Sequence, residues 1–287
     1  MSGSVAISKV PSAFIWRRLH SLMGFSFLLF LIEHLFTNSQ AALFFGGGGT
    51  WFVSSVNFLR DLPYLHVIEV ALLGIPIAYH GVLGLLYTFG GTYNNLSFSR
   101  IHPALSTTRN WAYSFQRWTA WILFVGIVLH VVQMRFLDYP YKYIEGSKAY
   151  YYCKLKTDPE LEKTAAQLGV TLYNDHEIRR APASLFAGLH SRTLDKGEVM
   201  ARSPSFGAIE LLNVRQAFQS VVMAILYTVF VLAAVFHGFN GLWTFLITWG
   251  LILSRKAQSQ SVYVCYGFLF LLLFLGLMSI WGTFILS

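Results

Sequence analysis

Charged residues are scarce in this sequence. Asp, Glu, Lys and Arg make up only 12% of its 287 residues, and 55% of the residues are hydrophobic. A soluble globular domain normally carries about 25% charged residues, because its surface faces water. The mean hydropathy is also high, at +0.53. This composition excludes an ordinary soluble domain and predicts a protein whose exterior faces lipid.

Cysteine is nearly absent as well. Cys153 stands in a polar stretch and Cys265 in an apolar run. Two such distant cysteines provide neither a disulfide framework nor the ligand spacing of a zinc site, so we interpret them as unpaired thiols. The net charge is +8, but the basic residues stand at the ends of apolar runs. We therefore expect them to set membrane topology and do not expect nucleic-acid binding.

Five apolar runs are long enough to cross a bilayer, which takes about 20 residues as a helix. They cover approximately residues 19–36, 66–89, 118–137, 218–250 and 262–286. The fourth run stays apolar to about Leu253, so we expect a strong tilt, a projection beyond the membrane, or a break near Gly238–Gly241. A polar insertion occupies 138–215. The sequence thus predicts an all-α integral membrane protein, a single domain over 1–287 with one extramembrane insertion.

Positive charge predicts the orientation. The N-terminal segment and the loops after the second and fourth runs hold basic residues and no acidic ones: Lys9, Arg17, Arg18, Arg100, Arg109, Arg117, Arg255 and Lys256. Such segments stay in the cytoplasm. We therefore expect a cytoplasmic N-terminus, an external C-terminus and an external insertion.

The first run has an alternative interpretation. Arg17 and Arg18 followed by an apolar stretch and then by Ser39-Gln40-Ala41 resemble a cleavable signal peptide. Glu33 and His34 lie near the far end of that stretch, where a signal-peptide core rarely tolerates polar residues. We therefore favour a membrane-spanning helix.

Four histidines lie inside four different apolar runs: His34, His80, His130 and His237. An ionisable residue within a membrane is costly and points to function. A single histidine of this kind could simply bond a neighbouring helix. Four of them on four spans predict a shared role as ligands.

Their depths sort the four histidines into two pairs. His34 and His130 lie late in spans that run outward, whereas His80 and His237 lie late in spans that run inward. A neutral imidazole on each side of a planar macrocycle suits haem iron. A structural zinc ion would instead need about four ligands on one centre. We therefore predict two b haems, an outer one between His34 and His130 and an inner one between His80 and His237.

Several polar residues are candidates for secondary roles. Arg17, His20 and Ser21 stand at the cytoplasmic edge of the first span, where donors could hold the propionates of the inner haem. Glu33 and Glu69 lie toward the outer side of their spans. Either carboxylate could exchange protons with a quinone there, although each could equally face interfacial water.

Several phrases in the sequence resemble one known family. They are RRLHSL at 17–22 with His34 fourteen residues after His20, PIAYHG at 76–81, FHGFNGLW at 236–243, and His130 followed by Gln133 and Arg135. Together they cover all the predicted spans that carry histidines. They resemble the diheme cytochrome b membrane anchor of succinate dehydrogenases and related fumarate reductases, in the single-chain form with five helices.

The resemblance implies a function in electron transfer. Such a subunit anchors a flavoprotein and an iron–sulfur subunit at the cytoplasmic face of a bacterial cytoplasmic membrane. Succinate is oxidised on the flavoprotein, and electrons pass through the inner and outer haems to menaquinone. The resemblance also assigns His80 and His237 to the inner, higher-potential haem, and places His20 and Ser21 at its propionates.

Two departures and two alternatives accompany this interpretation. The insertion at 138–215 is longer than the family leads us to expect, and Val235 stands where some fumarate reductases carry a carboxylate. The second departure favours succinate oxidation.

A diheme anchor of a formate dehydrogenase or a hydrogenase would show the same paired histidines. A haem-free proton-coupled transporter would need a repeat or a cluster of polar residues at the midplane, and we find neither in the sequence.

Overall fold

The computed structural model describes residues 10–90, 107–186 and 193–285, and five of its helices are long and apolar enough to cross a membrane. This number confirms the prediction. Lys9, Arg100 and the last residue of the predicted fifth span lie outside the described residues. The five candidate spans are α1 (Ser12–Ser39), α3–η1–α4 (Leu65–Gly90), α5–η2 (Thr108–Leu137), α9 (Val221–Thr248) and α10–η4–α11 (Arg255–Ile285).

Helix α9 is continuous. It runs without interruption through Gly238 and Gly241, where we considered a break. Its 28 residues correspond to about 42 Å at 1.5 Å per residue. The helix stops at Thr248, and Gly250 follows with a φ of 72°, a backbone conformation that glycine adopts without strain. The apolar run in the sequence is therefore longer than the helix that it forms.

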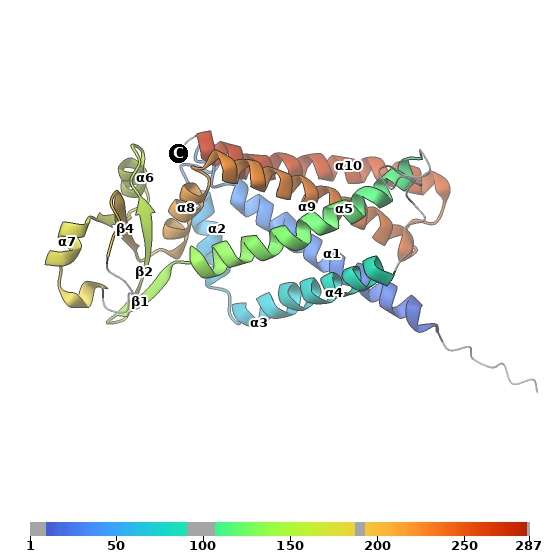
Figure 1. The fold of residues 1–287 in the computed structure, drawn as a ribbon, viewed down its shortest axis with the longest axis horizontal. Helices are drawn as coiled ribbons and strands as arrows, with labels where there is room; N and C mark the ends of the chain where they lie inside the picture. Colours follow the sequence, from blue (N-terminus) through green and yellow to red (C-terminus); the bar gives the residue numbers. More distant parts are fainter. Residues whose placement is uncertain (1–9, 91–106, 187–192, 286–287) are drawn as a thin grey trace, which may run out of the picture. The chain divides into compact units, whose positions relative to one another are not determined.

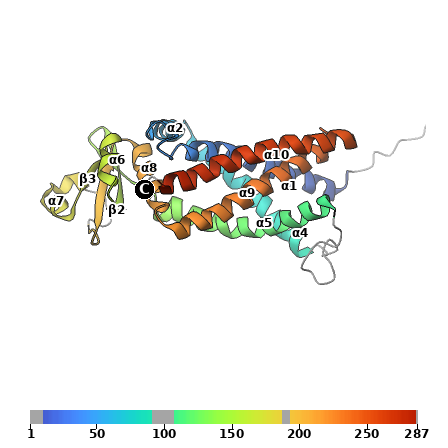
Figure 2. The ribbon, with the colours of Figure 1, turned by 90° about the horizontal axis from the view of Figure 1, so that it is seen from above.

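The described chain forms two compact units. The first takes its residues from 1–31, 66–120 and 236–269, and the second from 32–65, 121–235 and 270–287. The candidate spans contribute segments to both units. In both views α9 and α10 (Arg255–Leu277) run side by side (Figures 1 and 2).

A proline shapes the second span within the first unit. Pro76 has no backbone N–H, so it cannot bond the carbonyl of Leu72 four residues earlier. The hydroxyl of Ser26 on α1 donates to that carbonyl at 3.2 Å. The chain forms a π-helical turn, η1 (Val70–Gly74), just before α4 (Ile75–Gly90). A neighbouring side chain thus satisfies a backbone group that lipid would leave unpaired.

The second unit contains a sheet that we did not predict. Four antiparallel strands pair in the order β1-β2-β4-β3, and we call them with their helices the cap (Figure 1). The mostly helical class is confirmed, but the all-α description omits this sheet. The elements are α2 (Thr50–Arg60), β1 (Tyr141–Glu145), β2 (Lys148–Lys156), α6 (Leu161–Gln167), β3 (Thr171–Tyr173), α7 (Asp175–Arg180), η3 (Ala183–Phe186), β4 (Glu198–Ser203) and α8 (Phe206–Ala217).

Strand β2, one of the two central strands, carries apolar side chains on both faces. Tyr151, Cys153 and Leu155 pack in a cluster with residues of α6 and α8. Tyr152 points to the opposite face, into a cluster with Phe186. Successive side chains of a strand alternate between faces. Elements therefore cover both faces of the sheet, which explains why the sequence of β2 lacks a simple alternation of polar and apolar residues.

Asn57 joins α2 to the start of α8. Its side chain donates to the hydroxyl of Ser205 at 2.9 Å and accepts from the backbone N–H of Gly207 at 2.8 Å. Ser205 itself caps α8. A Cβ on Gly207 would lie 2.6 Å from the carbonyl oxygen of Val53, so the two helices approach closely only because this residue is glycine.

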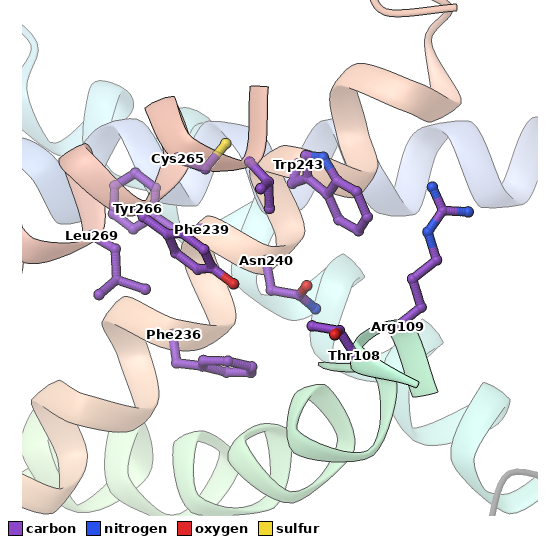
Figure 3. A pocket seen from close by; sticks show the side chains of 10 residues that line it. Thr108, Arg109, Phe236, Phe239, Asn240, Trp243, Cys265, Tyr266 and Leu269 are labelled. Atoms are coloured by element: carbon purple, nitrogen blue, oxygen red, sulfur yellow. The ribbon is translucent and has the colours of Figure 1, made fainter. Parts of the chain in front are cut away.

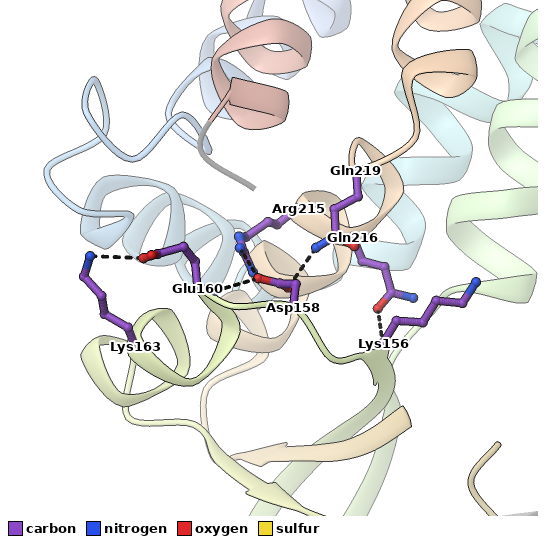
Figure 4. Close-up of polar contacts among 7 residues, drawn as sticks. All are labelled: Lys156, Asp158, Glu160, Lys163, Arg215, Gln216 and Gln219. Atoms are coloured by element: carbon purple, nitrogen blue, oxygen red, sulfur yellow. Dashed lines mark hydrogen bonds and ion pairs between the residues drawn. The ribbon is translucent and has the colours of Figure 1, made fainter. Parts of the chain in front are cut away.

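An ion pair between buried Arg215 and partly buried Asp158 fixes the loop before α6 to α8. Arg215 bonds both carboxylate oxygens of Asp158, at 2.7 and 3.0 Å, and Gln219 donates to the same carboxylate at 2.8 Å (Figure 4). Burial by itself raises the pKa of Asp158, but the hydrogen bonds and charge of Arg215 outweigh burial and lower it. Removing Asp158 would leave the buried charge of Arg215 uncompensated, which typically costs about 3–5 kcal/mol.

Glu210 is a second ionisable group in the interior of the cap, but it makes no such ion pair among the described residues. Among the described residues, its Oε2 atom is buried without a hydrogen bond. Burial raises the pKa of this carboxyl to about 7, and Asp138 adds to the rise. Hydrogen bonding from Asn213 and the charges of Arg135 and Arg60 oppose it. The folded cap therefore holds a proton that the unfolded chain releases near pH 4.5.

This linkage predicts a pH-dependent effect of Glu210→Gln. Stability of the wild-type cap falls as pH rises from about 4.5 to about 7, since the unfolded state loses its proton first. We expect the variant to match the wild type at pH 4.5 and to exceed it at pH 8 by at most about 3 kcal/mol. Thermal unfolding of the detergent-solubilised protein at both pH values measures the difference. Glu160→Gln, at the exposed pair with Lys163, is the control and should leave the stability unchanged at both pH values. Equal stability of Glu210→Gln and wild type at pH 8 would contradict the raised pKa of Glu210.

Candidate functional site: two histidine pairs

The first unit brings His80 and His237 together. His80 comes from α4 and His237 from α9. The ring centres lie 6.1 Å apart, and the ring planes are nearly perpendicular, at 82°. We call these two residues the inner pair. Two spans far apart in sequence thus place one imidazole opposite the other.

The second unit brings His34 and His130 together in the same way. His34 comes from α1 and His130 from α5 (Thr108–Val131). Their ring centres lie 5.8 Å apart, at an interplanar angle of 78°. We call these two residues the outer pair. The two pairings are those that depth along the spans predicts.

The separations suit a metal held between two imidazoles. An imidazole nitrogen lies about 2 Å from a bound transition metal, as in zinc sites, and a ring centre lies roughly 1 Å behind that nitrogen. One metal with two opposed rings therefore places the ring centres about 6 Å apart. Among the described residues, no group of three or more His, Cys, Asp or Glu side chains could hold a metal ion. Each pair brings two imidazoles together, a ligand type that binds haem iron.

In three of the four histidines, an oxygen atom of another residue lies within hydrogen-bond distance of Nδ1, the ring nitrogen nearer to the backbone. Nδ1 of His80 lies 3.0 Å from the backbone carbonyl of His20. Nδ1 of His237 lies 3.3 Å from the hydroxyl of Thr119, and Nδ1 of His130 lies 3.1 Å from the hydroxyl of Tyr227. Metal-binding histidines almost always donate their second nitrogen to such oxygens. Nε2 is then the nitrogen suited to iron.

His34 differs from the other three. Its Nδ1 lies 3.3 Å from the side-chain nitrogen of Asn38, which also donates to the carbonyl of His34 at 2.8 Å. The amide of Asn38 is therefore anchored to the turn of α1 that carries His34. This contact orients the ring from its own helix, whereas helix-to-helix contacts orient the rings of His80 and His130.

Gly24 makes room for the ring of His80. A Cβ on Gly24 would lie 2.7 Å from a carbon of that ring and 2.9 Å from its Nδ1. Real Cβ atoms essentially never approach so closely, so any larger residue would displace the imidazole. The absence of a side chain on α1 thus positions a candidate ligand on α4.

His20 is the predicted propionate-binding residue that reaches the inner pair. Its ring stacks on that of His80 with centres 4.0 Å apart, and its Nδ1 is buried without a hydrogen-bond partner among the described residues. Ser21 instead donates to the carbonyl of Arg18 and accepts from the indole of Trp249, each at 3.0 Å. Arg17 is exposed.

The two predicted quinone-side carboxylates lie in different units. Glu33 accepts a hydrogen bond from the hydroxyl of Thr37 at 2.7 Å. Glu69 lies 3.2 Å from Nδ1 of His66, and its side chain is 37% exposed. Both are partly accessible, so either could exchange a proton with a ligand or with water.

The phrase FHGFNGLW has a structural role that sequence reasoning did not identify. Asn240 donates to the side-chain oxygen of Gln116 at 2.8 Å, and Gln116 donates to the backbone carbonyl of His237 at 3.1 Å. The indole of Trp243 donates to the carbonyl of Gln258 at 3.0 Å. These bonds join α9 to α5 and to α10 around the histidine. Nothing in the spacing of Gln116 or Thr119 distinguished them from other polar residues of the third span.

A small pocket of about 80 Å³ lies between α9, α10 and the start of α5 (Figure 3). Phe236 and Asn240 line it, together with Arg109, Trp243 and Tyr266. Arg109 packs over the indole of Trp243, 5.4 Å from its centre. Neither His80 nor His237 lines this pocket, so it is separate from the space between those two rings.

Comparison with known proteins gives one informative similarity. The chain is 27% identical over 270 residues to the succinate dehydrogenase cytochrome b558 subunit of Bacillus subtilis (strain 168), covering 94% of this chain and 96% of that protein. No protein-family model matches the chain, and no solved structure matches it. The similarity thus extends over nearly the whole length of both chains and is not confined to one motif.

Proposed function

We propose that this chain is the membrane anchor and diheme cytochrome b subunit of a succinate dehydrogenase. It would carry electrons from an iron–sulfur subunit to menaquinone, while succinate is oxidised on a flavoprotein partner. The observation that carries the proposal is the pairing of four intramembrane histidines into two opposed sets. The full-length similarity to a cytochrome b558 subunit supports the same conclusion.

The chain's own residues would hold and orient two haems. His80 and His237 would hold the iron of the inner haem, and His34 and His130 that of the outer haem. The buried Nδ1 of His20 is available to a propionate; Arg17 and Ser21 would need other side-chain positions to contribute. A bis-imidazole haem takes up and releases one electron at a time.

The orientation and partners follow from charge and from the similarity. Basic residues at the N-terminal end and in two loops would keep those segments in the cytoplasm of a bacterium. The flavoprotein and iron–sulfur subunits would then bind at that face. The cap would lie on the opposite side, since it follows the outward-running third span. Glu33 and Glu69 would exchange protons with quinone at the outer side.

A reduced-minus-oxidised absorbance spectrum of the purified membrane complex, with a haem assay per chain, tests the proposal. We expect two b-type haems per chain and a covalent flavoprotein that copurifies. A copurifying molybdenum or nickel protein would favour a formate dehydrogenase or hydrogenase anchor instead. Absence of haem would refute the proposal and favour a proton-coupled transporter.

Single alanine substitutions test the pairing of ligands. We expect His80→Ala to remove the inner haem and retain the outer one, and His34→Ala to do the reverse, because each pair lies in its own compact unit. Redox titration of the absorbance change in each variant shows which haem remains. Two intact haems with unchanged spectra in either variant would show that the pairing is wrong.

Neutralising Glu69 tests its proposed role in proton exchange. We expect Glu69→Gln to slow quinone reduction by roughly 10²-fold, the low end for a positioned acid–base group, while both haems remain. Steady-state quinone reduction across pH, with haem content measured in parallel, gives the result. Glu33→Gln is the matched comparison, and normal turnover of Glu69→Gln at every pH would remove Glu69 from the proposed site.

A further inference from the structure

An imidazole ligand has to present a nitrogen without a proton to the metal. A neutral imidazole carries its proton on one nitrogen and leaves a lone pair on the other. The partner of the second nitrogen decides which tautomer forms. The contacts of Thr119 and Tyr227 therefore bear directly on whether His237 and His130 can act as ligands.

The hydroxyl proton of Thr119 is committed to the backbone. Its Oγ1 donates to the carbonyl oxygen of Phe115 at 2.7 Å, and the carbonyl of Gln116 lies 3.2 Å away. Carbonyl oxygens only accept hydrogen bonds. At the third contact, 3.3 Å from Nδ1 of His237, the Thr119 oxygen must accept. Nδ1 of His237 therefore carries the proton and Nε2 has the lone pair.

At the outer pair, the hydroxyl of Tyr227 contacts His130 as that of Thr119 contacts His237. Its hydroxyl donates to the side-chain oxygen of Gln133 at 3.3 Å and lies 3.1 Å from Nδ1 of His130. With its proton directed to Gln133, the phenol oxygen accepts from Nδ1. The phenol ring is held edge-to-face against Phe218, with ring centres 5.1 Å apart. A buried side chain thus holds the acceptor in place.

We propose that Thr119 and Tyr227 are positioning residues, one at each histidine pair, that fix the tautomer of the opposing ligand. Thr119, together with the backbone carbonyl of Gln116, fixes His237 of the inner pair, and Tyr227, oriented by Gln133, fixes His130 of the outer pair. The backbone carbonyl of His20 does the same for His80, and no substitution removes that acceptor. This inference rests on the proposed function, because it assigns the four rings to haem iron.

The hydrogen bond has two measurable consequences. It raises the basicity of the ligand imidazole, and loss of such a partner typically lowers metal affinity or activity about 10–100-fold. A more basic ligand favours the ferric state, so losing the bond raises the midpoint potential. A tenfold change in the relative stability of the two oxidation states corresponds to about 59 mV for a one-electron couple.

The experiment uses the complete membrane complex with Thr119→Val, Thr119→Ser and Tyr227→Phe. Valine keeps the shape of threonine and removes the hydroxyl, whereas serine keeps the hydroxyl. We expect Thr119→Val to raise the potential of the inner haem and weaken its retention about tenfold, and Thr119→Ser to restore both. Tyr227→Phe should change the outer haem in the same sense and leave the inner one unchanged, so each site is the control for the other.

Redox titration, haem content and the low-spin ferric EPR signal of each haem are the readouts, with His80→Ala and His34→Ala assigning the signals. If Tyr227→Phe fails to assemble, Gln133→Leu removes only the acceptor for the phenol and should also change the outer haem. Two haems with unchanged potentials and EPR signals in Thr119→Val and Tyr227→Phe would refute the inference and leave the proposed function intact. So would equal shifts of both haems in one variant. A wild-type complex without haem would refute the proposed function itself.

Discussion

The cost of an unpaired polar group in a lipid environment governs this structure. A spanning helix pairs its own backbone N–H and C=O groups through hydrogen bonds. Where one of these groups has no partner within the helix, a side chain from elsewhere has to bond it. Pro76 shows this directly, since the carbonyl that it leaves without a donor is bonded by Ser26 of another helix. The same rule applies to imidazoles, and the described structure gives each intramembrane histidine a polar contact at Nδ1. At His80, His130 and His237 the contact is an oxygen that can accept the Nδ1 proton, whereas at His34 it is the amide nitrogen of Asn38.

The histidine pairs combine this constraint with close packing. Gly24 permits the ring of His80 to approach α1, and the network of Asn240 and Gln116 fixes the backbone of His237. Each imidazole is thereby held by contacts that do not involve its partner in the pair. The separation and orientation of the paired rings therefore depend on each ring's own supports.

The cap is stabilised by a different set of forces. Its sheet is covered on both faces, and the Arg215–Asp158 ion pair joins the loop before α6 to α8. Glu210 lies near Arg60, Arg135 and Asp138 with one carboxylate oxygen unpaired. The cap is thus a folded structure with its own core, and burial raises the pKa of one carboxyl within it, that of Glu210.

The sequence by itself determined that five helices could cross a membrane and which four histidines lie inside them, because hydropathy and position along a span are local properties. Depth was also enough to pair the histidines. Only the tertiary structure decided the rest. The sheet was missed because β2 is apolar on both faces, and the supporting roles of Gln116, Thr119 and Tyr227 were missed because each acts on a residue more than 90 positions away. Contacts of that kind depend on how helices pack, which the order of residues along one span does not reveal.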